Sequence, residues 1–170
     1  MGTAVPIIRA EGEGEHLKFS GGGLMTMKAT SKETGGAFLL FEDRVVRGKA
    51  TPLHIHQNED ETFYVLDGEI LVFIDGVEHR VGPRGVAVAP RGVPHAFLVI
   101  SETARLLTLL IPGSAESFYR AASDPATADT DPSGPVDFER VRKAAQSSGG
   151  MKIVGPPPFK GSTARGRDRG

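Results

Sequence analysis

The sequence predicts an all-β domain, a closed barrel or sandwich of short strands, with helices only after the last strand. Two observations lead to this prediction. Glycine (22 residues) and proline (12 residues) lie between short apolar runs instead of gathering in one linker. In all-β domains these residues typically form the turns between strands. No helical pattern separates these runs, so the crossover helices that a parallel sheet needs are missing.

Nine segments are expected to form strands, at residues 24–30, 37–46, 52–56, 61–66, 69–74, 77–81, 86–89, 95–100 and 105–111. Asp67-Gly68 and Asp75-Gly76 each lie between two of these apolar runs. Asp-Gly pairs supply the positive φ angles that tight turns require. The middle of the chain is therefore expected to be a succession of adjacent short strands.

Two helices are expected beyond the strands. Ser114 can cap a short helix that ends near Ala122, and Pro135 suits the first turn of another that runs to about Gln146. The segment between them is expected to be a turn-rich loop. Residues 1–21 are expected to form an N-terminal arm, 22–113 the barrel, 114–159 a helical extension that packs on it, and 160–170 a disordered tail.

The composition is that of one soluble globular domain. The 170 residues include 20 basic and 21 acidic side chains, so no global field would recruit nucleic acid or an anionic membrane. The absence of cysteine excludes disulfides, thiolate metal sites and a cysteine nucleophile. The acidic start of the chain and the lack of a long apolar run favour a cytoplasmic location.

Four residues can bring metal-binding groups together. His54 and His56 are two apart in an expected strand, so both imidazoles lie on one face. Glu61 opens the next strand and can return alongside them, and His95 follows a rigid proline-glycine turn on a later strand. Three imidazoles and a carboxylate suit a divalent transition metal with open coordination positions. A cation would also offset the several kcal/mol that a buried, unpaired carboxylate costs.

Each of these residues also has a simpler interpretation. One His-x-His pair is often incidental, and Glu61 alone can be a surface charge at a strand end. His16 and His79 lie in charged surroundings and are expected at the surface. Glu59 and Asp60 lie in the polar turn before Glu61, where a solvated role is expected.

The spacing of the metal-binding residues resembles the cupin family. Gly48, His54, His56, Glu61 and Gly68 match the first cupin motif, G(X)5HXH(X)4E(X)6G, at every specified position. The second motif, G(X)5PXG(X)2H(X)3N, is matched at Pro90, Gly92 and His95, which retains the metal-bearing histidine. Arg84 stands at its leading glycine and Val99 at its final asparagine, which alters the turn and makes the wall more apolar.

The resemblance implies a double-stranded β-helix, the cupin jelly-roll barrel, with His54, His56, Glu61 and His95 as metal ligands. Further likeness in residues 34–38, 59–69, 90–97 and 155–158 makes the chain similar to single-domain bacterial cupins of the quercetin 2,3-dioxygenase type. The activity implied is O2-dependent cleavage of an aromatic enol such as a flavonol, in secondary metabolism. The cofactor implied is one divalent metal, Fe, Ni, Mn or Co, with Cu or Zn also compatible. Glu61 would take the substrate's hydroxyl proton, which makes it the catalytic residue.

The expected substrate pocket consists of apolar residues on the strands that carry the ligands. These residues are Phe63, Val65, Phe73, Phe97 and Val99. They also fit an ordinary barrel core, and the cavity is expected to hold few charges beyond the metal site. Cupins commonly pair through sheet extension, so a homodimer is expected.

Two other functions remain open at this stage. One is a non-oxidative cupin cyclase or isomerase that uses the metal only as a Lewis acid, and the other is a non-catalytic cupin that binds a small molecule. Whether residues from Ser114 onward cover the cavity or pack outside the barrel is also open.

Overall fold

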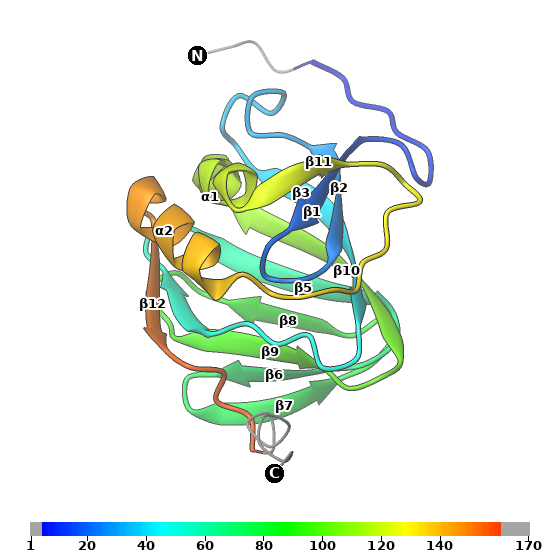
Figure 1. Ribbon diagram of the computed structural model, residues 1–170. Coiled ribbons are helices and arrows are strands. Elements are labelled where there is room, and N and C mark those ends of the chain that lie inside the picture. The colour runs from blue at the N-terminus through cyan, green and yellow to red at the C-terminus, as the bar shows by residue number, and fades with distance from the viewer. Residues whose placement is uncertain (1–4, 161–170) are drawn as a thin grey trace.

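Two antiparallel sheets face each other and form a flattened barrel (Figure 1). The computed structural model describes residues 5–160. The larger sheet has the strand order β11-β1-β2-β3-β10-β5-β8, and the smaller has the order β12-β4-β9-β6-β7. This arrangement is an all-β jelly roll, as the sequence predicts.

The larger sheet contains seven strands. They are β11 (Ser123–Ala126), β1 (Glu15–Phe19), β2 (Leu24–Ala29), β3 (Leu39–Val46), β10 (Thr103–Ile111), β5 (Asp60–Asp67) and β8 (Val86–Ala89). β10 lies between β3 and β5, and its pairing register sets Glu61 of β5 opposite Leu110. Alternate residues of β3 are buried, because every second side chain points between the two sheets.

The smaller sheet contains five strands and carries all three candidate histidine ligands. They are β12 (Met151–Gly155), β4 (Leu53–His56), β9 (His95–Val99), β6 (Ile70–Ile74) and β7 (Val77–Val81). β4 and β9 pair with His54 opposite His95, so the two imidazoles are neighbours across the strands. Because Glu61 belongs to the opposite sheet, a site built from all four residues must span the barrel interior.

The nine expected strands are all present, with ends shifted by at most two residues. Three further strands were not expected. β1 forms within the predicted N-terminal arm, β11 within the predicted loop, and β12 beyond the second helix. β1 pairs with both β2 and β11, and β12 pairs with β4, so these short segments depend on their neighbours for their strand structure.

The helices follow β10, as expected, but begin later than predicted. A 3-10 turn at Gly113–Ala115 leads into α1 (Glu116–Ala121), and α2 spans Phe138–Ser148. Ser114 caps neither, because its hydroxyl donates to Glu59. Asp137 caps α2 by accepting a hydrogen bond from the backbone of Arg140. Figure 1 shows both helices beside the barrel, with α2 leading into β12.

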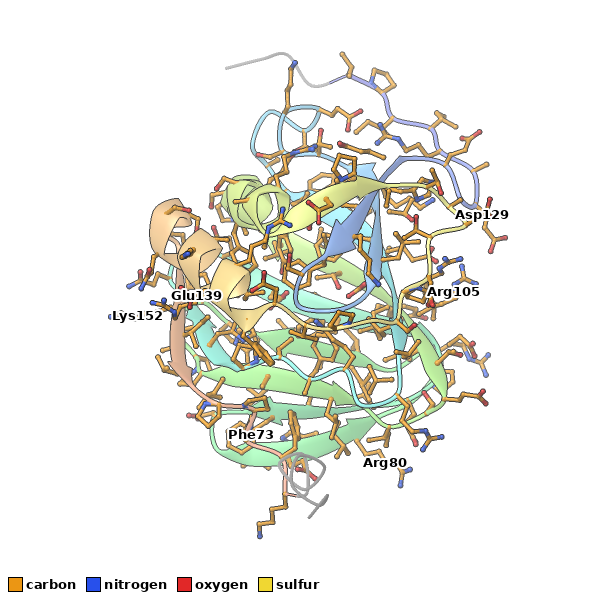
Figure 2. The ribbon with its side chains drawn as sticks, in the orientation of Figure 1. Phe73, Arg80, Arg105, Asp129, Glu139 and Lys152 are labelled. Atoms are coloured by element: carbon orange, nitrogen blue, oxygen red, sulfur yellow. The ribbon has the colours of Figure 1, made fainter. Side chains whose placement is uncertain are left out.

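Two apolar clusters fill the interior. One joins β1, β2 and β3 to the helices and includes Met25, Phe41 and Phe118. The other lies between the sheets and includes Phe63, Val65 and Val99. Charged side chains such as Arg80, Arg105, Glu139 and Lys152 lie around the outside (Figure 2). No helix in residues 5–160 is long and apolar enough to cross a membrane.

The predicted turns form in two different ways. Asp75 and Gly76 both have positive φ and close a two-residue hairpin between β6 and β7. Gly68 also has positive φ, but its turn carries the chain from one sheet to the other. Arg84, at the position where the cupin motif has glycine, has φ 65° and so retains the backbone shape that glycine would favour.

Candidate metal centre and cavity

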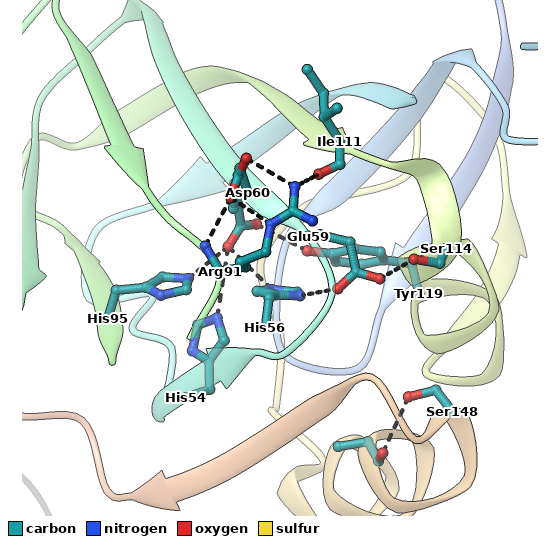
Figure 3. A network of polar contacts seen from close by, with 12 residues as sticks. His54, His56, Glu59, Asp60, Arg91, His95, Ile111, Ser114, Tyr119 and Ser148 are labelled. Atoms are coloured by element: carbon teal, nitrogen blue, oxygen red, sulfur yellow. Dashed lines mark hydrogen bonds and ion pairs between the residues drawn. The ribbon is translucent and has the colours of Figure 1, made fainter. Parts of the chain in front are cut away.

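Three histidines and one glutamate converge inside the barrel. The nitrogens Nε2 of His54, His56 and His95 lie 3.8, 3.2 and 2.9 Å from Oε2 of Glu61. All four residues are buried, with exposed fractions of 5% or less. Figure 3 shows the imidazole rings of His54, His56 and His95 lying close together.

The other ring nitrogens are turned away from this centre. His54 Nδ1 lies 2.8 Å from the carbonyl oxygen of Pro52, and His95 Nδ1 lies 2.9 Å from that of Val93. Because a carbonyl oxygen only accepts hydrogen bonds, each Nδ1 carries the proton. The lone pair of each Nε2 is then directed at the centre, as metal ligation requires.

Burial and charge act in opposite directions on the centre. Burial alone would raise the pKa of Glu61, but attraction to His56 and the close approach of all three histidine rings to Oε2 lower that pKa well below its ordinary value. Burial likewise lowers the pKa of His56, yet Glu61 and Glu59 raise it to about 9. Burial is the main cause of a lowered pKa at His54. Glu61 is therefore a buried anion at the centre of the three imidazole rings.

The residues present fit a divalent transition metal. One ligand atom from each of His54, His56, Glu61 and His95 lies within 4.8 Å of every other, so a single ion can contact all four. His56 Nε2 is buried and has no hydrogen-bond partner within the described chain, and an ion would satisfy it. Three imidazoles with one carboxylate is a donor set that suits Fe, Co, Ni, Cu, Mn or Zn.

The helical extension contributes to the centre. Tyr119 of α1 donates its hydroxyl to Oε1 of Glu61 at 3.1 Å, while Oε2 faces the histidines. Burial and the nearby Glu61 raise the pKa of Tyr119 well above its ordinary value, so the hydroxyl stays protonated. Residues beyond Ser114 therefore reach the interior, which answers the question that the sequence left open.

The prediction of a solvated Glu59 is wrong. Its side chain is 1% exposed, with Oε2 3.4 Å from His56 Nδ1, and Oε1 accepts a hydrogen bond from Ser114. The turn folds inward because Ser114, 55 residues later, supplies a polar partner inside the protein. Asp60 lies at the surface as expected and pairs with Arg91. His79 is exposed, and half-buried His16 contacts Thr26.

A cavity opens beside Glu61 and His54. Of the five predicted pocket residues, Phe63 and Phe97 line it. Val65 and Val99 lie in the core between the sheets instead, because the cavity extends toward β1 and the helices. Phe73 alternates with buried Ile70 and Val72 and so lies on the opposite face of β6. The helical extension supplies Phe118, Tyr119, Phe138, Val141 and Met151 to the wall.

The expectation of few charges in this cavity is also wrong. Asp43 and Lys49 line it and are 7% and 8% exposed. The sequence carried a signal for Asp43, because on an expected strand it lies on the same face as Leu39, Phe41 and Val45. Lys49 lies in the loop between β3 and β4, where strand periodicity indicates nothing.

Comparisons with known proteins agree with this geometry. Residues 42–111, which include all four residues of the centre, match a family model described as a cupin domain. Over 155 residues the chain is 30% identical to quercetin 2,3-dioxygenase from Bacillus subtilis (strain 168), which covers 90% of this chain and 45% of that protein. The chain thus spans less than half the length of this relative.

Solved structures share the fold. A variant of oxalate decarboxylase from Bacillus subtilis matches with a TM-score of 0.56 and 24% identity, over 67% of this chain and 31% of that chain. A predicted oxalate decarboxylase from Thermotoga maritima matches with a TM-score of 0.55 and 20% identity, over 64% and 99%. An RmlC-like cupin from Shewanella frigidimarina matches with a TM-score of 0.55 and 19% identity, over 62% of this chain and 89% of that chain.

Proposed function

The chain is a cupin similar to quercetin 2,3-dioxygenase, and we propose that it is a metal-dependent dioxygenase acting on a flavonol-like or polyketide-like aromatic enol. The observation that carries this proposal is the convergence of three histidine nitrogens and Glu61 Oε2 at the wall of a cavity lined by aromatic side chains. The enol and O2 are the two substrates proposed.

His54, His56, Glu61 and His95 would hold one divalent transition ion. When bound, that ion supplies a Lewis-acidic centre that makes an enol hydroxyl easier to deprotonate. The three histidines fix the position of the centre because backbone carbonyls hold two of the rings and Glu59 faces the third.

Glu61 is proposed as the base. Its carboxylate takes the proton from the enol hydroxyl, and the electron-rich enolate that remains is the species with which O2 reacts. Tyr119 holds Oε1 through its hydroxyl, so the carboxylate keeps one orientation relative to the substrate. Phe63, Phe97 and Phe118 line the cavity and keep water away from the enolate.

The test is O2 uptake by metal-loaded protein with quercetin as the probe, for wild type and Glu61→Gln. Turnover of the variant should fall about 100-fold or more, since general-base catalysis contributes on that scale. Asp60→Asn is the matched control, because it removes a neighbouring carboxylate that is exposed and paired with Arg91. Metal content and circular dichroism of each protein separate loss of the base from loss of the site.

Three outcomes would contradict the proposal. Turnover near wild type in Glu61→Gln would remove Glu61 as the base. Conversion of an enol that consumes no O2 would favour a cyclase or isomerase. Tight binding with no conversion by the metal-loaded protein would favour a small-molecule-binding cupin.

A homodimer remains a proposal supported by the sheet edges. β11 and β8 end the larger sheet, and β12 and β7 end the smaller. Within residues 5–160 each therefore has one edge that no other strand pairs with and that a second copy can meet. Light scattering after size exclusion should give twice the 18.0 kDa chain mass, whereas a single-chain mass would contradict pairing.

A further inference from the structure

Two charged side chains enter the cavity at a distance from the histidines. Asp43 points inward from β3 between Phe41 and Val45, and Lys49 reaches in from the loop before β4. Both are more than nine-tenths buried. Neither takes part in the proposed chemistry at Glu61.

The Asp43 carboxylate has an unused acceptor. Its Oδ1 is buried and accepts no hydrogen bond within residues 5–160. Burial raises the pKa of Asp43 to about 7, with attraction to Lys49 opposing that shift. A buried carboxylate oxygen without a partner is costly, so a native protein that retains one has a use for it.

The Lys49 ammonium has donors to spare. Its Nζ donates to the backbone oxygen of Gly21 and forms no ion pair with Asp43 in the described part of the chain. Nζ also lies 4.9 Å from the ring centroid of Phe19 and 5.9 Å from that of Phe97. An ammonium carries three N–H groups, so one backbone acceptor leaves others for a ligand.

The strand register sets the spacing between the two ends of the cavity. Glu61 lies opposite Leu110 of β10, whereas Asp43 lies opposite Leu106, four residues further along that strand. At 3.3 Å per residue this offsets the two positions by on the order of 13 Å along the strand direction. The row between them consists of Phe63, Thr108 and Phe41, so aromatic surface joins a metal end to a polar end.

We infer that Asp43 and Lys49 form a second recognition point that binds a hydroxylated aromatic ring at the end of the substrate remote from its metal-binding enol. One ring hydroxyl donates to the Asp43 carboxylate, and the oxygen of the adjacent ring hydroxyl accepts from Lys49 Nζ. This inference rests on the proposed function and narrows the substrate class to aromatic enols that carry a second ring with adjacent hydroxyls.

Ligand binding tests the inference without turnover. Zinc-loaded protein is titrated in the absence of O2, and zinc is chosen because it has no redox chemistry, so that binding is measured without turnover. The two ligands are quercetin and galangin, which lacks the two adjacent hydroxyls. Wild type should bind quercetin about tenfold more tightly, as expected for hydrogen bonds to charged groups. Lys49→Met and Asp43→Asn should each reduce this preference to within about twofold while leaving galangin affinity unchanged.

The matched controls remove one carboxylate and one ammonium group that lie outside the cavity. Glu42→Gln alters the adjacent residue of β3, which pairs with Arg105 outside the cavity, and Lys143→Met alters an exposed lysine of α2. Both should keep the wild-type preference. The comparison of the two flavonols on wild type needs no variant, so an unfolded variant does not prevent the test.

The outcomes separate the two proposals. Equal affinity of wild type for both flavonols, or a preference unchanged in both cavity variants, overturns the recognition point alone. If neither flavonol binds metal-loaded wild type, the inference fails together with the flavonol-directed function on which it rests.

Discussion

Two buried carboxylates inside the same cavity have opposite surroundings. Glu61 is surrounded by partners, since Oε2 faces three histidine nitrogens and Oε1 accepts the Tyr119 hydroxyl. Asp43 has an Oδ1 with no partner in the described chain. Both line one cavity and both are less than 10% exposed, so burial does not distinguish them.

The pKa of each carboxyl group follows its partners. The pKa of Glu61 is well below its ordinary value despite burial, whereas burial raises the pKa of Asp43 to about 7. Burial imposes a similar penalty on either charge, and only the neighbouring cationic groups and donors decide whether the charge persists. The Glu61 carboxylate thus has partners within the protein on both of its oxygens, whereas Asp43 Oδ1 has none in the described chain.

The largest expected effect comes from opening the metal end. His95→Ala removes one of four ligand atoms, so metal should fall from about one ion per chain to less than one tenth. Turnover should fall by at least 100-fold with it. His79→Ala is the control, because His79 is an exposed histidine on β7. Elemental analysis checks both proteins, and a His95→Ala protein that keeps its metal would exclude this centre.

A smaller effect on metal binding is expected from Glu59, which contacts the ligand His56 on the side away from the centre. Glu59→Gln keeps the shape of the side chain that faces His56 Nδ1 at 3.4 Å but removes its charge. Carboxylates behind histidine ligands typically contribute about 10–100-fold to metal affinity, so affinity should fall by at least tenfold. Competition with a chelator measures it, with Asp60→Asn as the exposed control. If Glu59→Gln and Asp60→Asn bind metal with equal affinity, Glu59 does not support the metal ligands and has only a structural role.

The metal end could be predicted from sequence because its information is local. A strand period of two sets His54 and His56 on one face, and the same parity joins Glu61 to Phe63. The nine predicted strands follow the same local pattern. Asp43 had a similar signal, since it lies on the same face of its strand as buried Phe41 and Val45, but a charged residue in a strand is ordinarily taken to face solvent.

The remaining features depend on contacts between distant parts of the chain. Glu59 is buried because Ser114 meets it from 55 residues away, and no local pattern carries that information. β1 and β11 are short and partly charged, and each forms a strand by pairing with the other. The cavity wall likewise needs Phe118 and Tyr119 from the extension, whose placement follows from tertiary packing.

Replacing Asp43 should change how stability depends on pH. The pKa of Asp43 is about 7 in the folded protein and near 4 in the unfolded chain, so the folded state holds its proton more firmly. The stability this provides is present below pH 4 and is lost as pH rises through 7. Lys49 and Lys18 oppose the shift, whereas Glu42 and Glu61 reinforce it.

The measurement for Asp43 is urea unfolding of wild type and Asp43→Asn at pH 5 and pH 8. Asp43→Asn should gain stability relative to wild type at the higher pH, by about 1–3 kcal/mol. Glu42→Gln, which lies on the outer face of the same strand, should show a much smaller change, because Glu42 adds to the raised pKa of Asp43 only through charge repulsion. A difference between wild type and Asp43→Asn that is the same at both pH values would mean that Asp43 is solvated.

The smallest effect is expected at the turn before β8, where Arg84 contacts Val65 near the end of β5. Arg84 is exposed, has φ 65°, and donates its backbone N–H to the oxygen of Val65 at 2.7 Å. A side chain in this left-handed region costs about 1–2 kcal/mol, which Arg84→Gly relieves at some cost in unfolded-chain entropy. Urea unfolding should show a net gain of about 0.5–1 kcal/mol, with metal content and flavonol preference unchanged. Arg84→Ala keeps the Cβ atom and should give no gain, so equal stabilisation by both variants would mean that the arginine head group, not the backbone, is unfavourable.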